Sequence, residues 1–212
     1  MLKYRTVAGA GFSEVTIEKS RFIGHIISAD SREVAEHFFA EIRKEHREAR
    51  HNVPALVIGD KKQMQWASDD GEPQGTAGAP ILQMIISEDI TNTAIMVTRY
   101  FGGIKLGTGG LVRAYTQTAK AALADAGTAA VREATEMRIR ITYPYLERLK
   151  FLCEKSGYTL NEITYSNDIS AIVSAASEQE EDLKIAILGL SNGTAEFLST
   201  IHKDVRFIPN AT

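Results

Sequence analysis

VTRYFGGIKLGTGGLVRAY, residues 97–115, runs from a predicted strand through a glycine-rich loop into a predicted helix. The β-branched and apolar residues from 93 to 100 are typical of a buried strand. Beyond the glycines, apolar residues recur at helical spacing to about Asp125. Thr108 is the expected N-cap of this helix, and its inward-facing residues are Leu111, Tyr115, Thr118 and Ala122. We therefore expect this part of the chain to pack helices against a sheet.

The loop has the composition of an anion-binding site. Its candidate ligand-binding residues are Arg99, Gly102, Gly103, Lys105, Gly107, Gly109, Gly110 and Arg113. Glycines let backbone N–H groups approach a ligand closely, and a helix N-terminus directs positive charge to the same place. A P-loop is excluded because Thr108 stands where that loop needs lysine, and a dinucleotide fingerprint would need glycine at Val112. The alternative is that the glycines only permit a tight crossing from strand to helix.

A second cluster of polar residues lies in SDDGEPQGTAGAPI, residues 68–81. Asp69, Asp70 and Glu72 place three carboxylates on one turn, and His51 opens an earlier predicted strand. We predict that these four residues share one cleft with Arg99, Lys105 and the glycine loop, because crowded acids and bases usually pair or share a ligand. The alternatives are a solvated acidic turn and a structural histidine. No residue is assigned as catalytic, and no metal or cofactor is expected.

The segments before residue 97 alternate between strand and helix patterns. Strand-like stretches cover residues 13–29, 51–60 and 63–70, and Pro54 suggests that the second of them is an edge strand or begins after the proline. A helix should follow Ser31 as its N-cap, with Val34, Phe38 and Ile42 on its inner face, and another should begin near Pro80.

The second part of the chain gives the element order β-α-β-β-α-β. A half-buried strand around Met137 to Ile141 is followed by a helix that ends at Gly157, two strands, a second helix and a last strand over about 194–207. This order is ferredoxin-like, with two helices over one face of an antiparallel sheet. The small-residue stretch ADAGTAA, residues 124–130, resembles a connection between domains. We therefore predict an α+β protein with domains at 1–127 and 131–212.

The composition restricts the functions that are available. The chain has 212 residues, 44% of them hydrophobic, and a net charge of −3 that falls entirely on residues 131–212. Any attraction for nucleic acid must therefore come from a local patch. Cys153 is the single cysteine, which excludes an internal disulfide and fits a reducing compartment. No stretch has the length of a membrane span or of a signal peptide, so we expect a cytoplasmic protein without a membrane partner.

Four motifs together resemble the Impact family of translation-linked proteins, in the two-domain bacterial form often called YigZ. They are EKSRF (18–22), ARHN (49–52), SDDGEPQGTAGAPIL (68–82) and the stretch 97–115. The resemblance implies a first domain with the fold of ribosomal protein S5 domain 2. It implies a second domain similar to the C-terminal ferredoxin-like domain of elongation factor G.

Two hypotheses for function follow from this resemblance. The first is a translation-linked regulatory protein that binds RNA phosphates or the ribosome through the glycine-rich site, with a protein partner in translation control. The alternative is an enzyme that acts on a phosphorylated or nucleotide small molecule in the same cleft, because small-molecule kinases share the first domain's fold.

Overall fold

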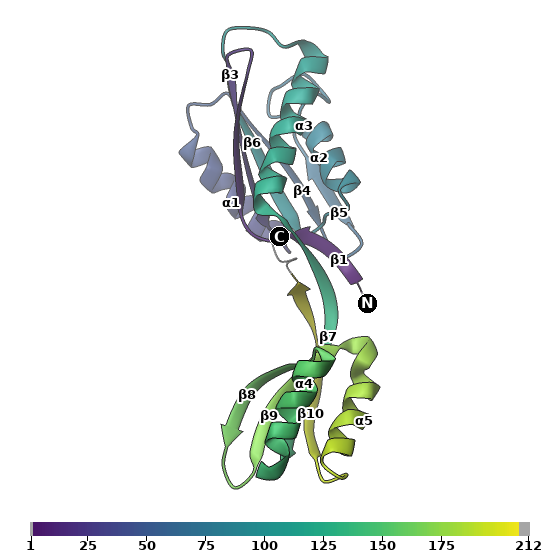
Figure 1. Ribbon diagram of the computed structural model, residues 1–212. Helices are drawn as coiled ribbons and strands as arrows, with labels where there is room; N and C mark the ends of the chain where they lie inside the picture. Colours follow the sequence, from purple (N-terminus) through teal and green to yellow (C-terminus); the bar gives the residue numbers. More distant parts are fainter. Residues whose placement is uncertain (1, 208–212) are drawn as a thin grey trace. The chain divides into compact units, whose positions relative to one another are not determined.

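The computed structural model describes residues 2–207, which form two compact units. The first unit spans Tyr4–Ala130 and the second contains Val131–Arg206. Each has mixed α and β structure, and the described part of the chain holds two five-stranded sheets and five α-helices (Figure 1). An α+β architecture is therefore correct in outline.

The sheet of the first unit has the strand order β2-β3-β6-β4-β5. The strands are β2 (Gly11–Ile17), β3 (Ser20–Ser28), β4 (His51–Ile58), β5 (Met64–Ala67) and β6 (Thr93–Tyr100), and all neighbours are antiparallel. The stretch read as one strand over 13–29 is thus a hairpin, because Glu18 and Lys19 take positive φ values and turn the chain.

Helices cover both faces of this sheet (Figure 1). On one face, α1 (Arg32–Glu45) packs Phe38 and Phe39 against apolar residues of β4 and β6. On the other face, α2 (Gly78–Ser87) and α3 (Gly107–Ala126) pack against the alternate residues of the same strands. Because both sides are covered, seven of the eight residues of β6 are buried. A side chain of β6 is therefore buried on whichever face of the sheet it lies.

Several local expectations hold in this unit and three do not. The hydroxyl of Ser31 caps α1 as expected, accepting a hydrogen bond from the amide of Val34, but the Val34 side chain is exposed. Ala35 and Phe39 take its place on the inner face. Thr108 is not an N-cap, because α3 begins one residue earlier, at Gly107, and has Leu106 as its cap residue.

The third error concerns Pro54, because β4 lies between β6 and β5 and is not an edge strand. The Pro54 carbonyl accepts a hydrogen bond from the amide of Ser68, just past the end of β5. The N–H and C=O of one strand residue point to the same side, so the missing Pro54 donor faces a place where the partner strand has ended. The sheet therefore loses no backbone hydrogen bond at Pro54.

The second unit follows the β-α-β-β-α-β order of its sequence pattern. Its elements are β7 (Thr128–Ile141), η1 (Tyr143–Tyr145), α4 (Leu146–Ser156), β8 (Thr159–Tyr165), β9 (Ile169–Ala176), η2 (Ser177–Gln179), α5 (Glu180–Leu190) and β10 (Glu196–Phe207). The strands β8, β9, β7 and β10 are neighbours in this order, and β1 (Leu2–Val7) also pairs with β7. Met137, Ile139 and Ile141 point into a core that Leu149 and Leu183 complete. Gly157 ends α4 with a φ of 70°.

The stretch expected to be a linker, residues 124–130, has regular structure. It forms the last turn of α3, the cap residue Gly127 and the beginning of β7. A strand paired to a neighbour is a poor protease substrate, so separate expression tests the domain boundary better than digestion does.

We propose that the two units are independent domains, and we expect a fragment of residues 1–130 to fold alone. The two apolar clusters of this unit consist of buried residues between Val7 and Ala126. The fragment therefore retains every residue of both apolar clusters. A cooperative thermal transition followed by circular dichroism would support this boundary. A fragment that binds a hydrophobic dye and melts without cooperativity would contradict it.

Candidate functional site

A buried ion pair connects three elements of the first unit beside a cavity. Arg99, the penultimate residue of β6, donates from Nη1 to Oε1 of Glu72 at 2.8 Å. Tyr115 of α3 donates its hydroxyl to the same oxygen at 2.7 Å. The side chains of Arg99 and Glu72 are 7% and 3% exposed. The loop between β5 and α2 is thus fixed to both the sheet and α3.

The surroundings of Glu72 determine the charge state of this cluster. Burial and the Glu72 carboxylate both raise the pKa of Tyr115, so its phenol stays protonated and remains a donor. The Arg99 guanidinium lies 5.4 Å from the ring centroids of Phe22 and Phe101. Its Nη2 contacts the Ser20 hydroxyl, whereas its Nε has no hydrogen-bond partner within the described residues. Glu72 therefore compensates the charge of Arg99.

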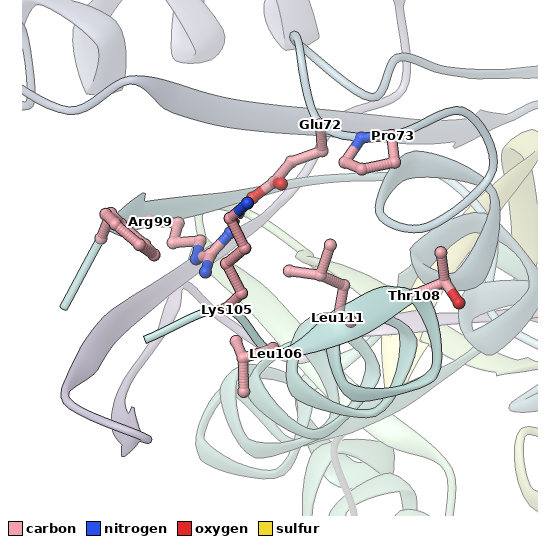
Figure 2. Close-up of a pocket in the computed structure, with 9 residues that line it drawn as sticks. Glu72, Pro73, Arg99, Lys105, Leu106, Thr108 and Leu111 are labelled. Atoms are coloured by element: carbon pink, nitrogen blue, oxygen red, sulfur yellow. Dashed lines mark hydrogen bonds and ion pairs between the residues drawn. The ribbon is translucent and has the colours of Figure 1, made fainter. Parts of the chain in front are cut away.

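The cavity beside this ion pair has a volume of about 280 Å³ (Figure 2). Its lining residues are Glu72, Pro73, Arg99, Phe101, Lys105, Leu106, Gly107, Thr108 and Leu111. The first turn of α3 forms one wall, and the described structure shows no side-chain hydrogen bond at its N-cap. Amides in a first helical turn have no intrahelical acceptor, so this wall offers N–H donors and the positive end of the helix.

Lys105 is the cation that remains available at this wall. It precedes α3 by two residues and lines the cavity, and none of the ion pairs found among residues 2–207 involves it. Arg113 lies farther along α3 and lines a neighbouring depression of about 420 Å³, which Lys105 also borders. Two of the three cations predicted for this loop, Lys105 and Arg113, therefore line the same depression.

The glycines of the loop serve different purposes. A Cβ at Gly102 would collide with the backbone of Lys19 and Ser20, so this residue is required by close packing. Gly103 and Gly107 have φ values of 88° and 68° and open space around them. Gly109 and Gly110 lie in the first turn of α3. Close packing against the turn at Lys19 and Ser20 therefore explains Gly102, and the positive φ values explain Gly103 and Gly107.

The predicted acidic cluster divides into structural and cavity residues. The Asp69 carboxylate accepts hydrogen bonds from the amides of Gly75, Ala77 and Gly78. Burial raises the pKa of Asp69, but these amide donors outweigh it and hold the pKa below its ordinary value. Asp70 accepts from the amide of Asn52 at 2.6 Å. These two carboxylates hold the loop in place, and Glu72 lines the cavity.

His51 lies next to Glu72, outside the lining of the cavity. Its Nδ1 donates to the carbonyl of Asp70 at 2.8 Å, which leaves the lone pair of the neutral ring on Nε2. That Nε2 is 4.0 Å from Oε1 of Glu72. The structure thus gathers His51, Asp70, Glu72 and Arg99 in one neighbourhood.

Sequence reasoning assigned Tyr115 and Phe101 no role at the site. Tyr115 was expected on the inner face of α3, and a buried tyrosine needs a partner for its hydroxyl, which was the available signal. No local pattern marks Phe101 or Ser20. Within residues 2–207, no group of three or more His, Cys, Asp and Glu side chains is already gathered to hold a metal ion. No described helix is long and apolar enough to cross a bilayer.

The fold and the cavity define an α+β protein of two compact units with a cavity at a helix N-terminus. The model of the Impact N-terminal domain matches residues 18–123, and the chain belongs to the Impact family. The IMPACT family member YvyE of Bacillus subtilis is 37% identical over 193 residues, which are 91% of this chain and 89% of the relative. YigZ of Escherichia coli, another family member, is 33% identical over 86% of this chain and 91% of its own.

A crystal structure described as that of a hypothetical protein also resembles this chain. It is 31% identical, with a TM-score of 0.61, and the match covers 94% of this chain and 98% of the other. Both units of the chain are therefore included in the likeness.

Proposed function

We propose that this protein is a translation-linked regulator whose cavity receives a phosphate group of RNA. The observation that carries the proposal is the open N-terminus of α3, which forms a wall of the cavity beside Lys105 (Figure 2). Backbone donors at a helix start, with a lysine next to them, match the charge and hydrogen-bonding needs of a phosphate. The Thr108 side chain lines the same wall and adds a hydroxyl.

The geometry reduces the number of phosphates that the site can neutralise. Arg99 and Lys105 were both expected to supply charge, but Glu72 already pairs with Arg99. Lys105 then contacts one phosphate, and Arg113 can reach a second one in the adjoining depression. Each phosphate contact contributes a slope of about −0.7 to log affinity against log salt for a single strand. We expect a total slope between roughly −0.7 and −1.4.

The inferred domain folds support a role in translation. The covered antiparallel sheet of the first unit is consistent with the S5 domain 2 fold, and the strand order β8-β9-β7-β10 is consistent with a ferredoxin-like second domain. The resemblance of both to domains of translation factors favours RNA or the ribosome as the partner, with a further protein partner in translation control. This proposal places the protein in the cytoplasm.

Lys105→Ala is expected to weaken RNA binding about fivefold near 0.1 M salt and to flatten the salt slope by about 0.7. The measurement is fluorescence anisotropy of a labelled single-stranded RNA at several salt concentrations. Lys61→Ala is the matched control, because it removes the same charge in the turn between β4 and β5, away from the cavity. Equal affinities and slopes for the two variants would disprove the assignment of the phosphate to this cavity.

A second candidate function is catalysis on a phosphorylated small molecule. It is favoured by His51, whose Nε2 lone pair lies near the buried Glu72 carboxylate while its other nitrogen is held by a carbonyl. A thermal-shift screen of nucleotides and phosphosugars distinguishes the two candidates. Strong stabilisation by one such compound, together with RNA binding that is absent or insensitive to salt, would support the enzyme.

A further inference from the structure

Two histidines that no sequence motif connects lie ring to ring on the first unit. His25 is on β3, and His46 is the residue that follows α1. Their ring centroids are 5.6 Å apart, and the two Nε2 atoms face each other at 3.4 Å. This pair is separate from the cavity, whose lining includes neither residue.

The distance between the two nitrogens fits two ligands of one metal ion. Two nitrogens bound to one tetrahedral zinc at its usual bond length lie about 3.3–3.4 Å from each other. Hydrogen bonds from N–H donors are normally shorter, about 2.7–3.2 Å. The observed 3.4 Å therefore equals the separation of two ligands of one ion.

The surroundings fix the orientation of the His46 ring. Its Nδ1 lies 3.0 Å from the hydroxyl of Tyr100, so that Nε2 faces His25. The Arg21 guanidinium packs 4.9 Å from the centroid of the Tyr100 ring and holds it in turn. A metal-binding histidine commonly has such a partner on its other nitrogen.

His25 is also held in position. The Phe12 ring packs edge-on against its imidazole at a centroid distance of 5.2 Å.

Glu45 can supply a third ligand. Its Oε1 is 3.8 Å from Nε2 of His46, and its side chain is 63% exposed and free to rotate toward the histidines. Two imidazoles and a carboxylate are a ligand set that Zn²⁺ accepts, with water in the fourth position. We propose that His25, His46 and Glu45 form a binding site for one zinc ion, in which the two histidines are already placed and Glu45 closes on the ion.

Calorimetric titration of the full chain with Zn²⁺ tests this site, with Co²⁺ absorption as a spectroscopic signature. We expect one ion per chain, and affinity reduced at least about tenfold in His25→Gln. Glu45→Gln should weaken binding less, because solvent can replace the carboxylate. His37→Gln is the matched control, since His37 lies on α1 with Glu41 at 3.5 Å but has no second histidine, and it should bind like the wild type.

Two results would overturn the proposal. One is that the wild-type protein does not bind one Zn²⁺ ion per chain in the micromolar range. This measurement does not depend on the folding of any variant. The other is equal affinity of the His25→Gln and His37→Gln proteins. Should His25→Gln unfold, Tyr100→Phe serves instead, because it removes only the partner of His46 Nδ1 and should lower affinity about tenfold. An unchanged affinity in that variant would likewise contradict the site.

Discussion

Glu72→Ala is expected to destabilise the first unit by about 3–5 kcal/mol, because it leaves the buried Arg99 guanidinium without its counterion. Tyr115 loses its hydrogen-bond acceptor in the same variant. Urea unfolding monitored by circular dichroism measures the change in the free energy of unfolding. Among residues 2–207, Glu72 is the only carboxylate that pairs with this guanidinium, so little of this loss can be recovered by rearrangement.

Two further variants separate the buried charge from a general effect of losing an acid. Glu14→Ala breaks the exposed pair with Arg21 at 3.7 Å and should cost less than about 1 kcal/mol. The double variant Glu72→Leu with Arg99→Met removes both charges and should be more stable than Glu72→Ala alone. If Glu72→Ala and Glu14→Ala unfold at the same urea concentration, the buried Glu72–Arg99 pair does not stabilise the unit more than the exposed Glu14–Arg21 pair does.

Gly102→Ala is expected to cost about 3 kcal/mol of stability, at the upper end for overpacked sites. The new Cβ would collide with the backbone of Lys19 and Ser20, and a backbone cannot move aside by changing a rotamer. The variant should also disturb the hydrogen bond from the Gly102 amide to the Ser20 hydroxyl, 3.1 Å long. Thermal and urea unfolding provide the measurement.

Gly9→Ala is the matched control for this glycine. No heavy atom lies within 4 Å of a Cβ built there, and the residue does not need a positive φ. Its stability should remain within about 0.5 kcal/mol of the wild type. A Gly102→Ala protein as stable as Gly9→Ala would show that the β2–β3 turn can shift to make room.

The periodic parts of the chain could be predicted from the sequence, because burial on one face imposes a repeat that the residues display. This periodicity correctly predicted the strand over 93–100 and the buried residues Leu111 and Tyr115 of the next helix. The preference of serine for the N-cap position also sufficed to predict the start of α1 at Ser31. Pro54 was misplaced because the sequence does not show where the partner strand ends.

The site was predicted less well, since the role of a charged residue depends on distant neighbours. Arg99 looked available for a phosphate, yet both faces of β6 are covered and Glu72 compensates its charge. Asp69 was expected in the same cleft, and the amides that follow it in the loop occupy its carboxylate. His25 and His46 went unnoticed because a hairpin strand and a helix end meet only in the folded chain.

The edge strands of the sheet in the first unit affect the tendency of this protein to aggregate. An exposed edge strand offers unpaired N–H and C=O groups that can recruit a strand from another molecule. At one edge, β5 has four residues and offers few such groups. At the other, the Asp125 carboxylate already accepts a hydrogen bond from the outer amide of Phe12 in β2. The short β5 and the occupied Phe12 amide therefore reduce the number of backbone groups that this sheet offers to a strand of another molecule.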